Sequence, residues 1–358
     1  MKFADIKDKI VNRMGFESLE QIRRAGYRVV RERDGDRYFL AREEELRPLL
    51  VKLGDIADVR FGIKTGANEF FYLAPVEKNV AEAVAEAQQN PETPIRVRNS
   101  AGWEGEIEAE FLKPVIKSPR EVRTLLVREK DLKYLLLMCP YSKEELRRKG
   151  KTKVLEYIKW GELQGFHKRQ TCKGRQRWWD LGNRSPADVN CNYLIDDRMR
   201  FYYGKVFVSD NFQEIRGGGK LLGAALQVPF LQIFCELGGR APFGGGLLKV
   251  QTYEVEELLV LNPSYLCCSQ RERLLSAFEQ LCQREIKSIF EELGLPKPNK
   301  GYSNIHPEDV ALEKVLSDRY ELDSVIFDAL GLTHEERLAV YRAVVQMVKD
   351  RLVKAKSV

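Results

Sequence analysis

The stretch from residue 167 to residue 179 is the feature that most restricts how this chain can fold. It holds five Lys or Arg residues, no acid, and an adjacent pair of tryptophans, Trp178 and Trp179. Cations neutralise phosphates and flat rings stack on bases, so the stretch predicts a nucleic-acid contact loop. The alternative is a solvated charged loop whose two tryptophans pack into the core. Both interpretations place the stretch at the surface of a folded unit.

Positive charge is concentrated around this stretch. The whole chain of 358 residues has a formal net charge of +6, whereas residues 142–184 contain thirteen Lys or Arg and five acids, a net of +8. The rest of the chain therefore sums to +6 minus +8, which is −2. A surplus confined to one window indicates a polyanionic partner that touches one face of the protein.

The remaining composition excludes several classes of protein. A hydrophobic fraction of 44% is that of a folded chain, long enough for two or three structural units. Seven cysteines without a Cys-x-x-Cys pair, accompanied by three histidines, argue against a zinc module and against a disulfide framework. We therefore expect reduced thiols and a cytoplasmic location. No apolar run approaches the length of a membrane span, so we expect no membrane association.

The order of patterns predicts an α+β fold in three parts. Residues 1–52 form a lead-in, residues 53–262 form a domain built on a mixed or antiparallel sheet, and residues 263–358 form a helical carboxy-terminal unit. Gly62 and Gly66 punctuate a turn that requires positive φ or close backbone approach. Apolar residues at helical spacing between residues 338 and 352, after Thr333-x-x-Glu336, predict the last helix.

Local signals predict further elements. Asp34-Gly35 predicts a hairpin turn between strands at 27–30 and 38–40, and residues 43–53 are expected to be helical. Ser142-x-x-Glu145 is a capping box that opens a basic helix through about Trp160. Ser269-x-x-Glu272 opens another helix, expected to run through Leu293.

Fragments that imitate catalytic motifs lack the context that those motifs need. Asn262-Pro263-Ser264-Tyr265 is similar to the Asn-Pro-Pro-Tyr tetrapeptide of amino-group methyltransferases. Here serine replaces the second proline, and no glycine-rich loop follows an early strand, so we interpret the fragment as a helix start. Glu285-Ile286-Lys287 imitates a nuclease motif but is expected in the middle of a helix. We assign no catalytic residue and no metal ligand.

Several blocks together resemble a known family, the target recognition domain of N6-adenine DNA methyltransferases from type II restriction-modification systems. That family includes the fused methylase-endonucleases of type IIG. The opening of the domain resembles residues 53–59 followed by Gly62-Ile63-Lys64-Thr65-Gly66 and the residues up to 71. The further blocks lie at 157–162, 177–181, 239–250, 260–263 and 323–351.

The resemblance implies a division of labour. In such enzymes an amino-terminal catalytic domain binds S-adenosylmethionine and flips an adenine, while the recognition domain reads the bases of duplex DNA. This chain departs from that order because it lacks the amino-terminal domain, so we expect it to hold no cofactor and to be inactive alone. We expect S-adenosylmethionine in a catalytic domain joined in cis or in trans. The chain is then a fragment of a longer enzyme or a separately encoded specificity unit.

The predicted function is sequence-specific recognition of double-stranded DNA for an adenine methyltransferase of a restriction-modification system. We expect backbone and base contacts from the basic stretch, supplemented by a second loop and by weaker candidates downstream. The candidate DNA-binding residues are Lys64, Thr65, Asn68, Lys168, Arg169, Lys173, Arg175, Arg177, Trp178, Arg198, Arg200 and Arg240. If all five cations from 168 to 177 met phosphates, the log–log salt slope of binding would be about −4 to −5.

Three alternatives stay open at the level of sequence. The chain could be a complete methyltransferase whose active site has no recognisable motif. It could be an interaction subunit, like a type I specificity half, whose helical tail docks a separate methylase. Its nucleic acid could be RNA instead of DNA, since charge and aromatic content do not distinguish the two.

Overall fold

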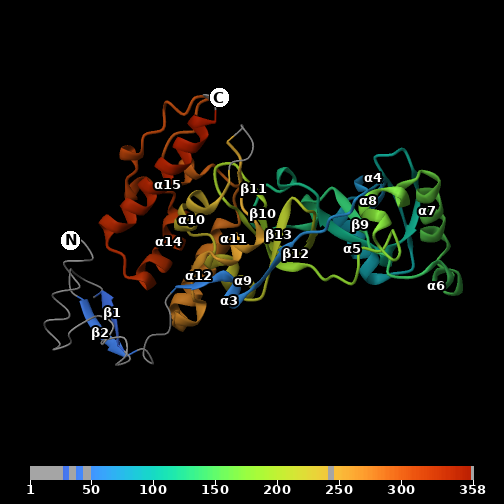
Figure 1. Ribbon diagram of the computed structural model, residues 1–358, viewed down its shortest axis with the longest axis horizontal. Coiled ribbons are helices and arrows are strands. Elements are labelled where there is room, and N and C mark those ends of the chain that lie inside the picture. Colours follow the sequence, from blue (N-terminus) through green and yellow to red (C-terminus); the bar gives the residue numbers. More distant parts are fainter. Residues whose placement is uncertain (1–26, 32–37, 43–49, 241–245, 356–358) are drawn as a thin grey trace.

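The computed structural model describes residues 27–31, 38–42, 50–240 and 246–355. Figure 1 shows an elongated molecule with its carboxy-terminal helices at one end and a smaller sheet-and-helix lobe at the other. A continuous sheet runs between the two ends. The predicted α+β class with a helical carboxy-terminal end is confirmed.

The predicted amino-terminal hairpin is present. Strands β1 (Tyr27–Arg31) and β2 (Tyr38–Arg42) pair antiparallel. Their turn at Asp34-Gly35 and the predicted helix over 43–49 lie outside the described residues. The end of that predicted helix is wrong, because residues 50–52 form strand β3 (Leu50–Lys52). This strand pairs with β15 (Leu259–Leu261), a partner some two hundred residues away that local sequence does not reveal.

The central sheet is mixed. Its spatial order is β4-β13-β10-β12-β8-β9-β5-β6-β7, and every adjacent pair is antiparallel except the parallel pair β12 and β8. The strands are β4 (Asp58–Phe61), β5 (Tyr72–Pro75), β6 (Pro94–Arg98), β7 (Glu104–Glu108), β8 (Leu112–Ile116), β9 (Tyr134–Leu137), β10 (Ala187–Asn192), β12 (Phe201–Val208) and β13 (Phe212–Arg216). A small separate sheet joins β11 (Leu194–Ile195) to β14 (Leu248–Lys249).

The helices of the distal lobe are short. They are α4 (Asn68–Phe71), α5 (Val80–Gln89), α6 (Lys143–Arg148), α7 (Thr152–Leu163) and α8 (Gln170–Lys173). The capping box at Ser142 is confirmed, since its hydroxyl accepts from the Glu145 amide at 3.2 Å. The basic helix that it opens was predicted to be continuous, and this is wrong. Gly150 adopts φ +70°, a left-handed conformation that ends α6 and separates it from α7.

The carboxy-terminal half is mainly helical. Its helices are α9 (Gly219–Ala225), α10 (Phe230–Gly238), α11 (Thr252–Glu256), α12 (Cys268–Leu281), α13 (Ile289–Glu292), α14 (Ser317–Leu330) and α15 (His334–Lys354), and α3 (Leu53–Ile56) packs with them. The stripe predicted on the last helix is buried, and Thr333 caps it as expected. The chain also makes 3₁₀ turns at η2 (Ala109–Phe111), η3 (Pro119–Glu121), η4 (Glu129–Asp131), η5 (Phe166–Lys168), η6 (Pro263–Tyr265), η7 (Pro307–Asp309) and η8 (Leu312–Lys314).

The helix predicted from a capping box at Ser269-x-x-Glu272 through Leu293 is wrong at both ends. The capping box is formed by Cys267 and Gln270, so Ser269 lies inside the helix. Helix α12 ends at Leu281, and Glu285-Ile286-Lys287 lie in an extended connection. There the Ile286 amide donates to the Arg123 carbonyl at 2.7 Å, which ties the connection to the distal lobe. Ser288 then caps a new helix, α13, by accepting from the Glu291 amide.

Two hydrophobic cores stabilise the described part of the chain. A distal core extends from Ile63 through Trp179 and takes in the central strands as far as Phe212. A proximal core begins at Leu53 and extends to Leu352. The proximal core includes residues on both sides of the predicted boundary at residue 262, so the carboxy-terminal helices pack against the central sheet.

No single helix among the described residues is long and apolar enough to cross a membrane. Helices α9 and α10 meet that test of length and composition only when taken together, and they are bent by 77° relative to each other.

Candidate nucleic-acid interface

The turn at residues 62–68 is held against the basic stretch by close packing. A Cβ atom at Gly62 would lie 2.0 Å from the Ser209 carbonyl oxygen, so only glycine allows this approach. Gly66 adopts φ +77°, and a Cβ there would lie 2.5 Å from the Thr171 Cβ. Both predicted reasons for glycine, close approach and positive φ, are confirmed.

The two tryptophans anchor the basic stretch. Trp178 and Trp179 retain exposed fractions of only 7% and 6%. The indole of Trp178 donates to the Glu162 carboxylate at 3.2 Å, and that of Trp179 donates to the Tyr141 carbonyl at 3.2 Å. Both indole N–H groups are hydrogen-bonded and both rings are buried, so the two tryptophans anchor the loop to the core. Neither ring is exposed for stacking on a base.

Arg175 connects the basic stretch to the glycine turn. Its Nη2 donates to the Lys64 carbonyl at 2.7 Å, and its Nη1 donates to the Trp178 carbonyl at 3.1 Å. The guanidinium also lies 5.6 Å from the Phe71 ring centroid. Several of its donors are therefore already used within the protein, and its position is fixed by both segments.

Two further arginines of the stretch form ion pairs. Arg169 binds the Glu69 carboxylate through two nitrogens, at 2.7 and 3.3 Å, which lowers the pKa of Glu69. Arg177 binds the carboxylate of Asp180 from its Nε at 3.2 Å and from its Nη2. The Arg169 side chain is 42% exposed and that of Arg177 is 30% exposed. Exposed pairs of this kind are weak and exchange readily with other anions.

Three lysines form the exposed part of this surface, which we call the lysine face. Lys64, Lys168 and Lys173 are exposed, and within the described residues no acid or carbonyl pairs with their ammonium groups. The Arg175 bond to the Lys64 carbonyl and the close approach of Gly66 to Thr171 hold the segment that carries Lys64 against the segment that carries the other two, about a hundred residues away in sequence. An ammonium group without an internal partner is available for an external anion.

The polar candidates of the turn have different roles. Thr65 is buried, with an exposed fraction of 1%, and its hydroxyl donates to Asn68 Oδ1 and accepts from the Ala67 amide at 3.3 Å. It stabilises the turn from inside. Asn68 is exposed beside it, and its amide nitrogen points to no described partner.

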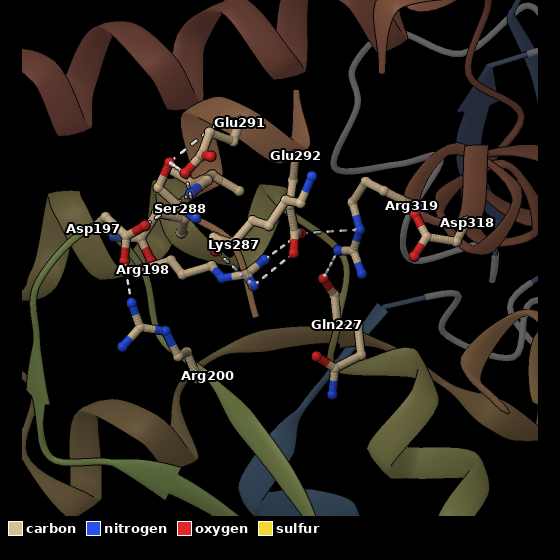
Figure 2. Close-up of polar contacts among 12 residues, drawn as sticks. Asp197, Arg198, Arg200, Gln227, Lys287, Ser288, Glu291, Glu292, Asp318 and Arg319 are labelled. Atoms are coloured by element: carbon tan, nitrogen blue, oxygen red, sulfur yellow. Dashed lines mark hydrogen bonds and ion pairs between the residues drawn. The ribbon is translucent and has the colours of Figure 1, made fainter. Parts of the chain in front are cut away.

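The downstream arginines lie elsewhere and are engaged. Figure 2 shows Arg198 directed at Glu292, to which it donates from both terminal nitrogens, one of them at 2.9 Å. Arg198 is 7% exposed and so is not available to DNA in this conformation. Arg200 pairs with Asp196 at 3.0 Å and with Asp197. Arg240 is 60% exposed and pairs with Glu254 at 3.1 Å.

The carboxylates of this inner network are strongly perturbed. Burial disfavours the charge of Glu292, yet Arg198, Arg319 and Arg284 lower its pKa to about 2. Burial raises the pKa of Asp197 to about 6 in spite of Arg200. The network joins the 195–200 segment of the sheet domain to α13 and α14, so its role is to fix the helical unit.

Two exposed glutamines were not predicted as candidate DNA-binding residues, because the prediction was based on charge. Gln170 and Gln176 are exposed within the basic stretch, and no described residue pairs with their side-chain amides. A glutamine amide can bond an adenine edge with two hydrogen bonds. The signal was present in the sequence as the interleaving of Gln with Lys and Arg between residues 168 and 177.

The fragments that imitate catalytic motifs are structural. Asn262 Oδ1 accepts from the Ser264 amide at 3.1 Å and from its hydroxyl at 2.8 Å, so the tetrapeptide is a capped turn, as predicted. Among the described residues no group of three or more His, Cys, Asp or Glu is placed to hold a metal ion.

A rigid turn that presents unpaired lysines and free amides is typical of modules that bind nucleic acids. Comparison with known families gives the class directly. Residues 40–293 match the family described as the type II methyltransferase M.Eco57I, C-terminal domain. The match spans well over half of the chain, so the chain belongs to this family, and the resemblance drawn from the sequence is confirmed.

Solved structures give more distant similarities. The type IIG restriction endonuclease BpuSI aligns with a TM-score of 0.47 and 12% identity, over 89% of this chain and 36% of that one. The type IIL restriction-modification enzyme MmeI, solved in complex with DNA, aligns with a TM-score of 0.44 and 12% identity, over 91% of this chain and 41% of that one. The chain thus spans about two fifths or less of the length of either enzyme. A comparison with curated proteins found no match.

Proposed function

We propose that this chain recognises duplex DNA as the specificity portion of a type II restriction-modification methyltransferase. The observation that carries the proposal is the lysine face, because Lys64, Lys168 and Lys173 are brought together by a locked turn and left without internal partners. Membership of the M.Eco57I C-terminal family supports it. Lysines needed only for solubility would not require a glycine at positive φ and an arginine that bonds the Lys64 carbonyl to hold their segments together.

Different residues of the surface have different tasks in this proposal. The three lysines bind backbone phosphates, which positions the protein on the duplex without reading its sequence. Gln170, Gln176 and Asn68 offer exposed amides that can read base edges. Arg169 can release Glu69 for a phosphate, since their pair is exposed. Arg175, Trp178 and Thr65 act within the protein, to fix the turn and the stretch.

The proposed parent reaction is methylation of adenine N6 with S-adenosylmethionine as the methyl donor. Among the described residues, the fragment at Asn262 does not fit the target-amine site of that reaction. Asn262, which would have to hold the target amine, uses its carbonyl oxygen to cap its own turn. We therefore assign the chemistry to a catalytic domain in cis or in trans and assign no step of it to this chain. We also propose a cytoplasmic location, which the odd number of cysteines supports.

The test is binding of duplex DNA by a charge-reversed lysine face. The variant Lys64→Glu, Lys168→Glu, Lys173→Glu should lose binding of a fluorescent duplex at moderate salt by at least tenfold, measured by anisotropy. The matched control is Lys297→Glu, Lys314→Glu, Lys349→Glu, which changes the same charge on the carboxy-terminal helical unit at the opposite end of the molecule. We expect the control to retain binding.

Two results would count against the proposal. Equal losses in both triple variants would mean that binding depends only on net charge. Duplex RNA that competes as well as duplex DNA would overturn the assignment to DNA, because A-form and B-form grooves present different surfaces.

A further inference from the structure

Three arginines converge on one buried carboxylate, at the edge of the central sheet next to the lysine face. The Glu214 carboxylate has an exposed fraction of 0%. It pairs with Arg216 at 2.8 Å, with Arg184 at 3.2 Å and with Arg60 at 3.7 Å. We call these residues the Glu214 cluster. Arg60 and Glu214 are register partners across β4 and β13, so both point to the face opposite the proximal core.

The cluster is fixed by contacts outside its ion pairs. Arg184 donates to the Phe61 carbonyl at 2.7 Å, which connects the loop after the tryptophans to the strand before the glycine turn. Arg216 donates to the Ser185 hydroxyl at 3.0 Å. The Arg60 side chain, by contrast, makes only ion pairs at 3.5 Å or longer and is 45% exposed. The guanidinium of Arg60 is therefore open to solvent, whereas those of Arg184 and Arg216 are held by hydrogen bonds.

The charge of the cluster is not balanced. Three arginines face Glu214 and the exposed Asp58, which pairs with Arg60 at 3.5 Å, so one positive charge is left over. The inner network of Figure 2 provides an internal comparison. There the buried Arg198 and Arg319 and the partly exposed Arg284 meet three carboxyl groups, those of Glu292, Asp318 and Asp323. A cluster of like charges near the surface is disfavoured unless an anion compensates it.

The position of the cluster continues the lysine face. Arg60 precedes Lys64 by four residues, so their Cα atoms lie within about 14 Å of each other even in a fully extended chain. That distance corresponds to about four base-pair steps of B-DNA at 3.4 Å each. Arg184 follows Trp179 by five residues, in the same loop system. A duplex that contacts Lys64 is therefore long enough to reach Arg60 as well.

We propose that the Glu214 cluster is a second anion subsite, in which Arg60 binds a DNA backbone phosphate beside those bound by the lysine face. Glu214, Arg184 and Arg216 position this guanidinium and supply the positive surroundings. The inference rests on the proposed function and deepens it, since it extends the contact surface from the loops onto the sheet. The planar fork of arginine binds two oxygens of a phosphate at once.

The experiment compares Arg60→Ala with Arg96→Ala in the full chain, with a fluorescent duplex as the probe. Arg96 is a matched control, because it is 53% exposed and pairs with two acids, Glu77 and Glu104. It lies on β6, seven strands from β4 in the sheet, which is about 34 Å at the usual strand spacing. Arg60→Ala should weaken binding and reduce the magnitude of the log–log salt slope by about 0.9. Arg96→Ala should change neither.

The outcomes separate this inference from the proposed function. If the wild-type chain binds duplex DNA and the two variants give the same affinity and slope, the second subsite is overturned and the lysine face stands. If the wild-type chain binds no duplex, the proposed function fails and this inference fails with it. Arg60→Lys should keep most of the slope, because the slope depends on the charge at this position. Unfolding midpoints of all variants confirm that each is folded.

Discussion

Arg175 donates a hydrogen bond from its Nη2 to the main-chain carbonyl of Lys64 at 2.7 Å, across 111 residues of sequence. This bond joins the two segments that carry the exposed lysines. It also changes the expected role of Arg175, which sequence charge alone marked as a phosphate contact. The lysine face therefore depends on Arg175, whose terminal nitrogens already donate hydrogen bonds within the protein.

Arg175→Ala should therefore weaken DNA binding without changing its dependence on salt. The substitution removes the donor to the carbonyls of Lys64 and Trp178, which should cost about 0.5–1.5 kcal/mol of unfolding free energy for each bond. Arg177→Ala is the control, because its partner Asp180 lies only three residues away. Urea unfolding and salt titrations of both variants provide the measurement. A slope reduced by about 0.9 for Arg175→Ala would show instead that it binds a phosphate.

Gly66→Ala should destabilise the turn more than the left-handed conformation alone explains. Gly66 has φ +77° and a Cβ there would meet Thr171 at 2.5 Å. Gly102 has φ +87° and open space around its Cβ position, so Gly102→Ala isolates the cost of the conformation, about 1–2 kcal/mol. We expect a larger loss of unfolding free energy for Gly66→Ala, together with weaker DNA binding. Equal losses of unfolding free energy in the two variants would mean that the turn accommodates the added Cβ without displacing Thr171 of α8.

Gln176→Ala should relax base selection and leave the salt slope unchanged. Its side chain is exposed in the basic stretch and carries no charge. If it reads an adenine, its loss should reduce discrimination at one position by about 1–3 kcal/mol. Selection from a pool of random duplexes, sequenced for the wild type and the variant, measures this. An unaltered preference at every position would exclude Gln176 as a base-reading residue.

Glu292→Gln should lower the unfolding free energy at neutral pH, and this difference from the wild type should disappear in acid. The arginines lower the folded-state pKa of Glu292 to about 2, below its ordinary value of 4.5, so its stabilising contribution is present above about pH 4.5. That contribution is lost as pH falls through 2. Removing one partner of a buried pair costs about 3–5 kcal/mol. Urea unfolding at pH 7, 4 and 3 should show the difference between wild type and variant shrinking, whereas a constant difference would contradict the ionised network.

The features predicted well from sequence are those set by neighbours in the chain. The capping boxes at Ser142 and Thr333, the two amino-terminal strands and the positive φ of Gly66 depend on residues near in sequence. The mixed sheet and the helical end followed from periodicity, which is also local.

The features that sequence did not reveal depend on distant partners. A lysine or arginine is identical in sequence whether it is free, as Lys173 is, or paired, as Arg198 is with Glu292 at 94 residues' separation. The strand at 50–52 was expected to be helical because its partner β15 lies at the other end of the domain. The location of the candidate interface in the chain stays a prediction, and dividing its residues into exposed and supporting ones required the structure.

The salt dependence of duplex binding tests the lysine face most directly. Three unpaired lysines should contribute about 2.7 to the magnitude of the log–log slope, at about 0.9 for each phosphate contact. Lys64→Ala, Lys168→Ala, Lys173→Ala should therefore flatten the wild-type slope by about 2.7 while far-UV circular dichroism and the unfolding midpoint stay unchanged. A triple variant that keeps the wild-type slope would contradict the account, because DNA would then bind a different surface of the protein.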